Sequence, residues 1–329
     1  MDVRAEPPLS ASRALVLGAG GQDGSYLCEL LLGRGYDVVG VVPDAAATSP
    51  NLAGVAGELS LVDVDLLDLD AVESLLREHA PHELYNLAAP TFVPRSWDEP
   101  VETVRFVTVA ITVVLEAVRV VDATVRVFQA SSAEVFGNPT EVPQTEATRR
   151  APATPYGAAK AFADLAVDAY RRRYGLHASC GILYNHESPR RPPEFLPRKV
   201  ARAAAAIARG DERELELGDL DAERDWGYAP DYVDAMWRML QQDAPGDYVV
   251  ATGVAHSVEE LVATAFARAG LDWRAHVRVD DSLRRREGLR GLVGDASRAR
   301  TSLGWTPTVG FEELVGLLVD AELSSEGAP

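Results

Sequence analysis

The stretch RALVLGAGGQDGSYLCELLLGRGYDVVGVV (residues 13–42) decides the fold of this chain. It opens with an apolar run, passes through a cluster of glycines, continues as a leucine-rich amphipathic segment and closes with a second apolar run. Apolar runs bounded by glycine predict strands, and leucines spaced three and four residues apart predict a helix. We therefore predict a strand, a tight turn, a helix and a second strand.

The same alternation continues beyond residue 42. The sequence predicts a strand at ELSLVDVD, a helix at DLDAVESLLREH and a strand at ELYNLAA. It also predicts long helices over 101–121 and 155–174. This regularity predicts an α/β fold with a doubly wound parallel sheet (Rossmann) and a smaller, mostly C-terminal α/β domain for the substrate. The predicted dinucleotide-binding domain spans 13–185 with 228–255 returning to it, the nucleotide-sugar-binding domain spans 186–227 and 256–322, and 1–12 and 323–329 are flexible tails.

Composition narrows the possible partners. The 329 residues carry a net charge of −18, which argues against nucleic acid, and no apolar run approaches the 18 residues that a membrane span needs. Cys28 and Cys180 lie in apolar stretches without metal-ligand spacing. We therefore predict buried free thiols, no metal site, no membrane partner and a reducing, cytoplasmic location.

The glycine cluster has the chemistry of a dinucleotide site. Gly18, Gly21 and Gly24 form a G-x-x-G-x-x-G pattern directly after an apolar strand and at the start of a helix. Such a turn lets the backbone approach a pyrophosphate at the helix N-terminus. Asp44, 20 residues beyond Gly24, is either a ligand of the ribose hydroxyls or an ordinary loop carboxylate. Asp65, which ends the third predicted strand, has the same two interpretations for the adenine.

A second set of residues has the chemistry of a catalytic site. The chain has only two lysines, Lys160 and Lys199, and Lys160 follows Tyr156 by four residues, on the same face of a predicted helix. An ammonium placed there can lower the pKa of the tyrosine, which then acts as a general base. Ser132 ends the strand VRVFQASS as a hydrogen-bond donor, and Glu134 points to the same side if the strand continues. Glu134 can abstract a proton from carbon, or it is a helix-capping or loop carboxylate.

These residues together resemble an extended short-chain dehydrogenase/reductase. Four stretches, GQDGSYL, YNHESPRR, LDAERDWGYAPDYVDAMW and ATGVAHSVEE, resemble the GDP-mannose 4,6-dehydratase family more specifically. The resemblance runs from about residue 13 to residue 322. It implies a lyase that turns a GDP-hexose into a GDP-4-keto-6-deoxyhexose, with hydride passing from C4 to the cofactor and back to C6 while water is lost.

The resemblance also assigns roles to individual residues. Tyr156 takes the O4 proton, Ser132 assists it, Lys160 supports it, and Glu134 removes the C5 proton. The implied cofactor-binding residues are Gly18, Gly21, Gln22, Asp23, Gly24, Asp44, Asp65, Leu66, Leu87 and Ala88, with Tyr156 and Lys160. The implied substrate-binding residues are Ser96, Asn185, Glu187, Arg191, Lys199, Arg224, Arg284 and Glu287.

Three departures from the family pattern affect what is expected. Ala133 replaces the family's Ser, which leaves open whether Glu134 or a water protonates the departing hydroxyl. Pro90 and Phe92 replace polar residues beside the hexose, so the identity of the sugar is open. Pro43 and Asp44 replace paired arginines, and the loop after them is short, which favours NAD over NADP. The short loop also favours a homodimer, formed through the Tyr156–Lys160 helix and the helix over 101–121.

Two other functions share part of this pattern. A nucleotide-sugar 4-epimerase uses the same Ser, Tyr and Lys but returns hydride to C4, and Ala133 keeps that alternative open. A non-catalytic dinucleotide-binding regulator would keep the fold, although such proteins tend to lose the tyrosine or the lysine. Glu134 and the four family-specific stretches favour the dehydratase.

Overall fold

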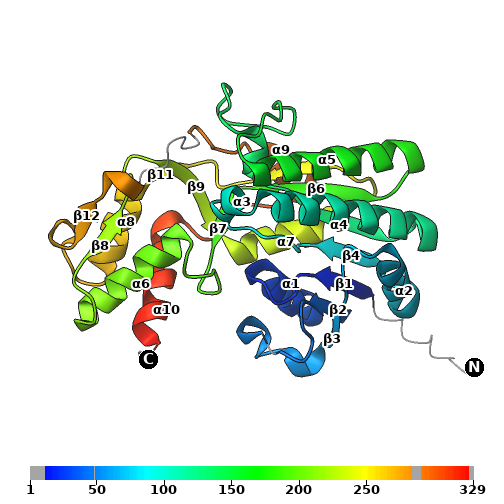
Figure 1. The fold of residues 1–329 in the computed structure, drawn as a ribbon, viewed down its shortest axis with the longest axis horizontal. Coiled ribbons are helices and arrows are strands. Elements are labelled where there is room, and N and C mark those ends of the chain that lie inside the picture. The colour runs from blue at the N-terminus through cyan, green and yellow to red at the C-terminus, as the bar shows by residue number, and fades with distance from the viewer. Residues whose placement is uncertain (1–11, 48, 284–289, 326–329) are drawn as a thin grey trace, which may run out of the picture.

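A parallel sheet of seven strands forms the centre of the larger of two lobes in the computed structural model, which describes residues 12–47, 49–283 and 290–325 (Figure 1). In spatial order the strands are β10 (Asp247–Val250), β6 (Ala178–Leu183), β5 (Arg126–Ala130), β4 (Glu83–Asn86), β1 (Arg13–Leu17), β2 (Asp37–Val42) and β3 (Ser60–Asp63). The order reverses direction between β1 and β4, and open α/β sheets bind their ligands at such a reversal. The doubly wound fold predicted from the sequence is confirmed.

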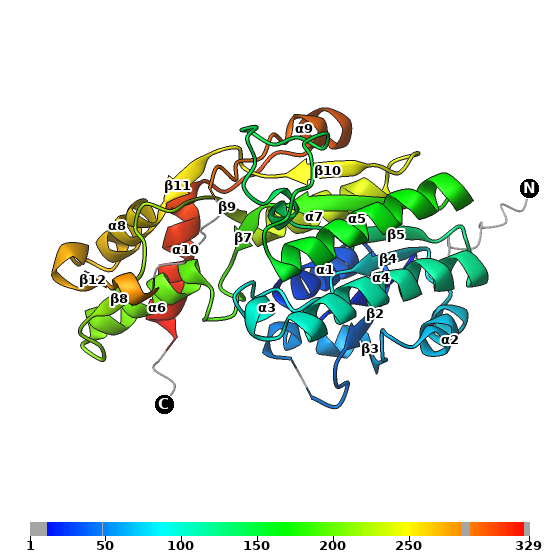
Figure 2. The ribbon, with the colours of Figure 1, turned by 45° about the horizontal axis from the view of Figure 1, so that its top comes forward.

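Helices cover both faces of this sheet (Figure 2). One face packs against α1 (Gln22–Gly33) and α7 (Ala229–Leu240), and the other packs against α2 (Leu69–His79), α4 (Pro100–Val121) and α5 (Pro155–Tyr174). The two resulting apolar cores are separated by the sheet. Strands buried on both faces are apolar at nearly every position, which explains the continuous runs that predicted them.

Helix α5 begins and ends where the sequence predicts, for identifiable reasons. The Thr154 hydroxyl caps its first turn by accepting a hydrogen bond of 2.9 Å from the Gly157 amide, and Pro155 occupies the first helical position. Gly175 follows the last turn at φ = 70°, a left-handed conformation that favours glycine. Residues 154–175 therefore carry their own start and stop signals.

The smaller lobe holds most of the remaining elements. Its core is formed by α6 (Leu196–Arg209), α8 (Val258–Arg268) and α10 (Phe311–Ser324), packed beside the two-stranded sheet of β8 (Leu215–Leu217) and β12 (Val277–Val279). A three-stranded sheet of β11 (Ala255–Ser257), β9 (Glu223–Tyr228) and β7 (Asn185–Glu187) lies between the lobes (Figure 1). Short helical turns are α3 (Arg95–Asp98), η1 (Pro50–Leu52), η2 (Ala56–Glu58), η3 (Ala133–Phe136), η4 (Trp273–Ala275) and η5 (Asp281–Leu283).

One late segment packs differently from the predicted division into domains. Helix α9 (Ser297–Leu303), expected in the smaller domain with the rest of 256–322, packs against β10 and α7 of the larger lobe. Trp305 is fully buried there, and its indole N–H donates to the Asp231 carbonyl at 2.7 Å. This burial corrects the predicted boundary, because contacts between residues about 70 positions apart leave no local pattern. The predicted tails fall mainly on 1–11 and 326–329, outside the described residues.

Cys28 and Cys180 are buried free thiols, as predicted. Within the part of the chain that the structure describes, none of the helices combines the length and apolarity of a membrane span.

Candidate functional site

The glycine turn between β1 and α1 packs tightly against the start of the helix. Gly18 has φ = +84°, and its amide and that of Ala19 donate to the Val41 carbonyl at 3.0 and 3.1 Å. A Cβ on Gly24 would lie 2.2 Å from the Gly18 carbonyl oxygen, so only glycine lets the first turn of α1 pack against this loop. The amides at the N-terminus of α1 therefore stand at the reversal point of the sheet, where a pyrophosphate can approach.

The two carboxylates predicted to contact the cofactor follow adjacent strands. Asp44 comes after β2 and accepts a hydrogen bond from the Ala46 amide at 2.9 Å, and Asp65 comes after β3 and accepts one from the Leu67 amide at 2.9 Å. Both side chains are exposed, whereas Leu66 is buried. Leu87 lines the cavity described below, and Ala88 packs against Gly18. Their contacts with a dinucleotide stay predictions.

Two motifs that are far apart in sequence interlock beside the turn. The Gln22 amide donates to the His186 carbonyl at 3.1 Å and accepts from the Ser188 hydroxyl at 2.8 Å, so it links α1 to the segment after β7. These internal contacts use its buried side-chain amide, and the predicted contact of Gln22 with a cofactor stays a prediction. Arg190 extends the link by pairing with Glu29 at 2.6 Å. GQDGSYL and YNHESPRR thus form one structural unit.

His186, which the sequence argument missed, sits at the centre of this unit. Its ring nitrogens lie 2.7 Å from the Tyr184 carbonyl oxygen and 2.9 Å from an Asp23 carboxylate oxygen, both of which only accept. Burial alone would lower the pKa of His186, but Asp23 outweighs it and raises that pKa. Burial likewise would raise the pKa of Asp23, and His186 instead brings it down to about 2. The pair is therefore an ion pair that fixes the cofactor turn against β7.

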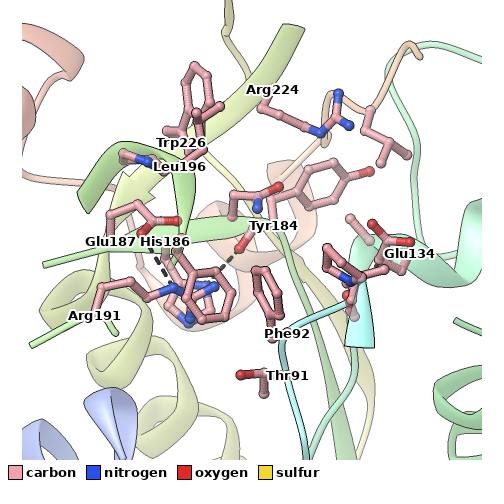
Figure 3. A pocket seen from close by; sticks show the side chains of 18 of the residues that line it. Thr91, Phe92, Glu134, Tyr184, His186, Glu187, Arg191, Leu196, Arg224 and Trp226 are labelled. Carbon is pink, nitrogen blue, oxygen red and sulfur yellow. Dashed lines mark hydrogen bonds and ion pairs between the residues drawn. The ribbon is translucent and has the colours of Figure 1, made fainter. Parts of the chain in front are cut away.

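A cavity of about 530 Å³ opens from this unit across both lobes. Figure 3 shows Phe92 projecting into it, with Glu134 on one side and Arg191 on the other, and with Arg224 and Trp226 at the top of the view. The volume is within the range for a small-molecule site. Catalytic groups predicted from the sequence therefore share one cavity with predicted substrate contacts from the smaller lobe.

Ser132 and Glu134 reach this cavity by a route that differs from the predicted one. Strand β5 ends at Ala130, and Ser132 then caps η3 by accepting a hydrogen bond of 3.2 Å from the Glu134 amide. The condition that the strand continues to Glu134 is therefore not met, because the serine hydroxyl starts a helical turn instead. Glu134 lines the cavity, and the Thr154 hydroxyl lies 3.3 Å from its Oε2 as a donor.

Tyr156 and Lys160 line the floor of the same cavity from α5. Burial raises the pKa of Tyr156, with a further rise from Glu134, while Arg191 and a hydrogen bond with Ser132 lower it. Lys160 has its Nζ 5.7 Å from the tyrosine ring centroid and donates to the Ala130 carbonyl at 2.8 Å. The expected lowering of the tyrosine pKa is therefore not seen, because burial and the Glu134 charge dominate.

The predicted substrate residues divide into three groups. Asn185, Glu187, Arg191, Lys199 and Arg224 line the cavity. Ser96 does not, because its side chain is 1% exposed in α3 and its hydroxyl donates to the Val93 carbonyl at 2.7 Å. This corrects the prediction for Ser96, whose hydroxyl completes a local turn. Arg284 and Glu287 lie outside the described residues.

Arg191 is held in place by two neighbours on the cavity wall. Its Nε lies 3.3 Å from Glu187 Oε2, and its guanidinium stacks 3.6 Å from the centroid of the Phe195 ring. Phe195 in turn meets Phe92 edge to face, with ring centroids 5.4 Å apart. Sequence reasoning missed Phe195, because an aromatic residue in a proline-rich loop gives no periodic signal. The stack presents a cation beside an apolar wall.

Comparisons with known proteins agree with this geometry. A family model described as GDP-mannose 4,6 dehydratase matches residues 15–318. The chain is 44% identical to GDP-mannose 4,6 dehydratase 2 of Arabidopsis thaliana over 324 residues, covering 94% of this chain and 86% of that protein. A UDP-glucose 4-epimerase of Thermus thermophilus, solved with NAD, has a TM-score of 0.84 at 28% identity, covering 95% of this chain and 99% of that one. A dTDP-glucose 4,6-dehydratase of Streptomyces venezuelae, solved with NAD, has a TM-score of 0.83 at 25% identity, covering 95% and 97%.

Proposed function

The chain belongs to the GDP-mannose 4,6-dehydratase family, and we propose that it converts a GDP-hexose into a GDP-4-keto-6-deoxyhexose with loss of water. The observation that carries the proposal is the meeting of four side chains at one cavity, although they come from two separate stretches of the sequence. These side chains are Ser132, Glu134, Tyr156 and Lys160. Oxidation at the sugar hydroxyl requires an acid–base group such as the tyrosine. The elimination that follows requires a base for the adjacent C–H, such as the carboxylate.

We assign the proton steps to this chain's own side chains. Tyr156 takes the proton of the C4 hydroxyl as a phenolate, the form that the nearby Arg191 charge favours against burial. A bound nicotinamide dinucleotide supplies the hydride acceptor and donor. The C4 ketone acidifies the C5–H, and Glu134, oriented by Thr154, removes that proton as the C6 hydroxyl leaves. Ala133 has no proton to offer, so the departing hydroxyl takes its proton from Glu134 or from a water.

The cationic side chains of the cavity suit a diphosphate. Arg191 and Arg224 are planar donors that bind phosphate oxygens in pairs, and Lys199 adds a point charge on α6. Trp226 supplies an aromatic wall in the same region of the cavity. We assign the nucleotide diphosphate to this side, which leaves the hexose beside Phe92 and Glu134.

We propose NAD as the cofactor. The glycine turn brings the N-terminus of α1 to the reversal point of the sheet, and Asp44 follows β2, where a carboxylate favours a free ribose 2′-hydroxyl. No arginine stands between residues 43 and 76 to bind a 2′-phosphate. Dinucleotide released from the purified protein should run as NAD on ion-exchange chromatography, and titration should show tighter binding of NAD than of NADP. Release of NADP alone would contradict this assignment.

Product analysis tests the proposed reaction. The protein is incubated with GDP-mannose and, separately, with other GDP-hexoses, and products are identified by mass spectrometry and NMR. We expect a product lighter by one water, with a C4 ketone and a C6 methyl group. A product of unchanged mass would instead identify a 4-epimerase, which the likeness to a solved epimerase and the presence of Ala133 make the second candidate. Binding without turnover of any GDP-hexose would indicate a regulator.

We also propose that the chain forms a homodimer through α4 and α5, which lie side by side (Figures 1 and 2). Large apolar side chains project outward from this pair and from α3 just before it, and they include Trp97, Val101, Phe162 and Leu165. Exposed apolar side chains on adjoining helices favour an interface, and a two-fold axis would place them against their own copy. A cytoplasmic location is part of the same proposal, because both thiols are free and buried.

A further inference from the structure

A buried carboxylate lies one helical turn beyond Lys160. Asp164 is the residue at i+4 from Lys160 on α5, and its side chain is 4% exposed. Side chains spaced by four residues are neighbours on a helix surface. Tyr156, Lys160 and Asp164 therefore form one row, which runs from the cavity floor into the protein interior.

Asp164 has few of the contacts that normally compensate a buried charge. Neither carboxylate oxygen of Asp164 accepts a hydrogen bond from a described residue. The nearby Ser131 hydroxyl nevertheless lowers the pKa of Asp164. Its nearest cation by distance is the Arg150 guanidinium, whose Nε lies 3.6 Å from Oδ2. Burying a carboxylate this way is costly, so a purely structural role would favour a neutral side chain here.

Arg150 compensates the buried charge of Asp164 only in part. Its Nη1 donates to the Glu146 carbonyl at 2.6 Å and to the Thr148 carbonyl at 3.3 Å, and its guanidinium lies over the Phe136 ring at 5.7 Å. These contacts order the loop that precedes α5. The Arg150 guanidinium faces Asp164 through its Nε. The second cation near the carboxylate is Lys160, one turn earlier on α5, and it lowers the pKa of Asp164 less than Arg150 does.

We propose that Asp164 is a positioning residue for Lys160. The Asp164 carboxylate provides the negative charge that keeps Lys160 an ammonium on the cavity floor. The inference rests on the proposed function, in which that ammonium supports Tyr156. Lys160 needs such a counter-charge, because its only hydrogen bond among the described residues goes to a neutral carbonyl, that of Ala130.

The charges that face this pair are consistent with the proposal. Burial lowers the pKa of Lys160 to about 8, and Asp164 is the largest influence in the opposite direction. Burial raises the pKa of Asp164 to about 6, while Ser131, Arg150 and Lys160 lower it and Asp247 on β10 raises it. Asp247 is itself paired with Arg171 at 2.7 Å. Burial holds the pKa of the Cys180 thiol on β6 well above its usual range, and Cys180 and Asp23 also raise the pKa of Lys160.

The scarcity of lysine makes this pKa directly measurable. Protein labelled with ¹³C-lysine contains only two labelled side chains, and Lys199→Arg assigns the two signals. In the unliganded protein we expect the Lys160 signal to titrate near pH 8. Asp164→Asn removes the negative charge and keeps the shape, so the ammonium should lose its proton earlier, at about pH 7, as the loss of one close opposite charge predicts.

A matched control comes from the next turn of the same helix. Asp168 pairs with Arg172 at 2.7 Å at the surface, and Asp168→Asn should leave the Lys160 pKa unchanged. In activity assays, the alkaline limb of kcat/KM should move to lower pH in Asp164→Asn by the same amount as the NMR titration. A drop in melting temperature with an unmoved titration and an unmoved limb would overturn the proposal.

Two further outcomes are decisive. If Asp164→Asn does not fold, the wild-type Lys160 signal still tests the proposal, because it should show a second, smaller inflection near pH 6 as Asp164 ionises; its absence would overturn the proposal. If the wild type dehydrates no GDP-hexose while Asp164→Asn still lowers the Lys160 pKa, the proposed function fails and the link between Asp164 and Lys160 holds.

Discussion

At the scale of single residues, Glu134 decides which reaction follows oxidation at C4. Glu134→Gln keeps the shape of the side chain and removes its basicity, so dehydration should fall by about 10³-fold, as expected for loss of a general base. Reduced dinucleotide, followed by its absorbance in a single turnover, should still form, because Tyr156 and Lys160 are intact. Glu78→Gln, at an exposed position on α2, is the control and should dehydrate normally. Normal dehydration by Glu134→Gln would show that another group removes the C5 proton.

At the scale of elements, the first turn of α1 must pass very close to the glycine loop. Gly24→Ala would place a methyl group 2.2 Å from the Gly18 carbonyl oxygen, so we expect a loss of about 1–3 kcal/mol in stability and roughly tenfold weaker dinucleotide binding. Gly33→Ala, at the other end of the same helix, meets nothing within 4 Å and should be neutral or stabilise by up to about 1 kcal/mol. Thermal unfolding and fluorescence titration measure the two quantities. Equal effects from both substitutions would contradict the proposed tight approach.

Also at this scale, the sequence predicted elements better than it predicted contacts. Helix α5 was predictable because Thr154, Pro155 and Gly175 mark its ends locally. The strands were predictable because burial on both faces makes them continuously apolar. The η3 turn at Ser132 was missed, since a serine can either extend a strand or cap a helix with little difference in local energy.

The candidate site shows the same limit. Its four catalytic candidates were found because tyrosine, lysine and carboxylate chemistry requires those residue types at those spacings. The pairing of Gln22 with Ser188, and of Asp23 with His186, joins residues more than 160 positions apart. No local pattern encodes such contacts, and the two motifs were therefore assigned separate roles although they form one unit.

At the scale of the whole molecule, the apolar face on α4 and α5 predicts a dimer. Light scattering should give a mass about twice the 35.4 kDa of one chain. Leu165, 64% exposed on α5, lies on this face, and Leu165→Glu should yield monomers because it would bury a charge at the interface. Val279→Glu, at an exposed apolar position on β12 in the smaller lobe, should leave the mass unchanged. A dimeric Leu165→Glu protein would place the interface elsewhere.

The return of α9 to the larger lobe has a consequence for engineering this protein. The polypeptide leaves the larger lobe after β6, comes back for α7 and β10, departs again and comes back once more for α9. The smaller lobe is built from separate segments of the chain. It therefore cannot be replaced by the corresponding lobe of another enzyme in a single fusion, because several segments would have to be exchanged at once. Altered sugar preference is more accessible through point changes at Phe92, on the loop after β4, and at Ala133, the first residue of η3 after β5.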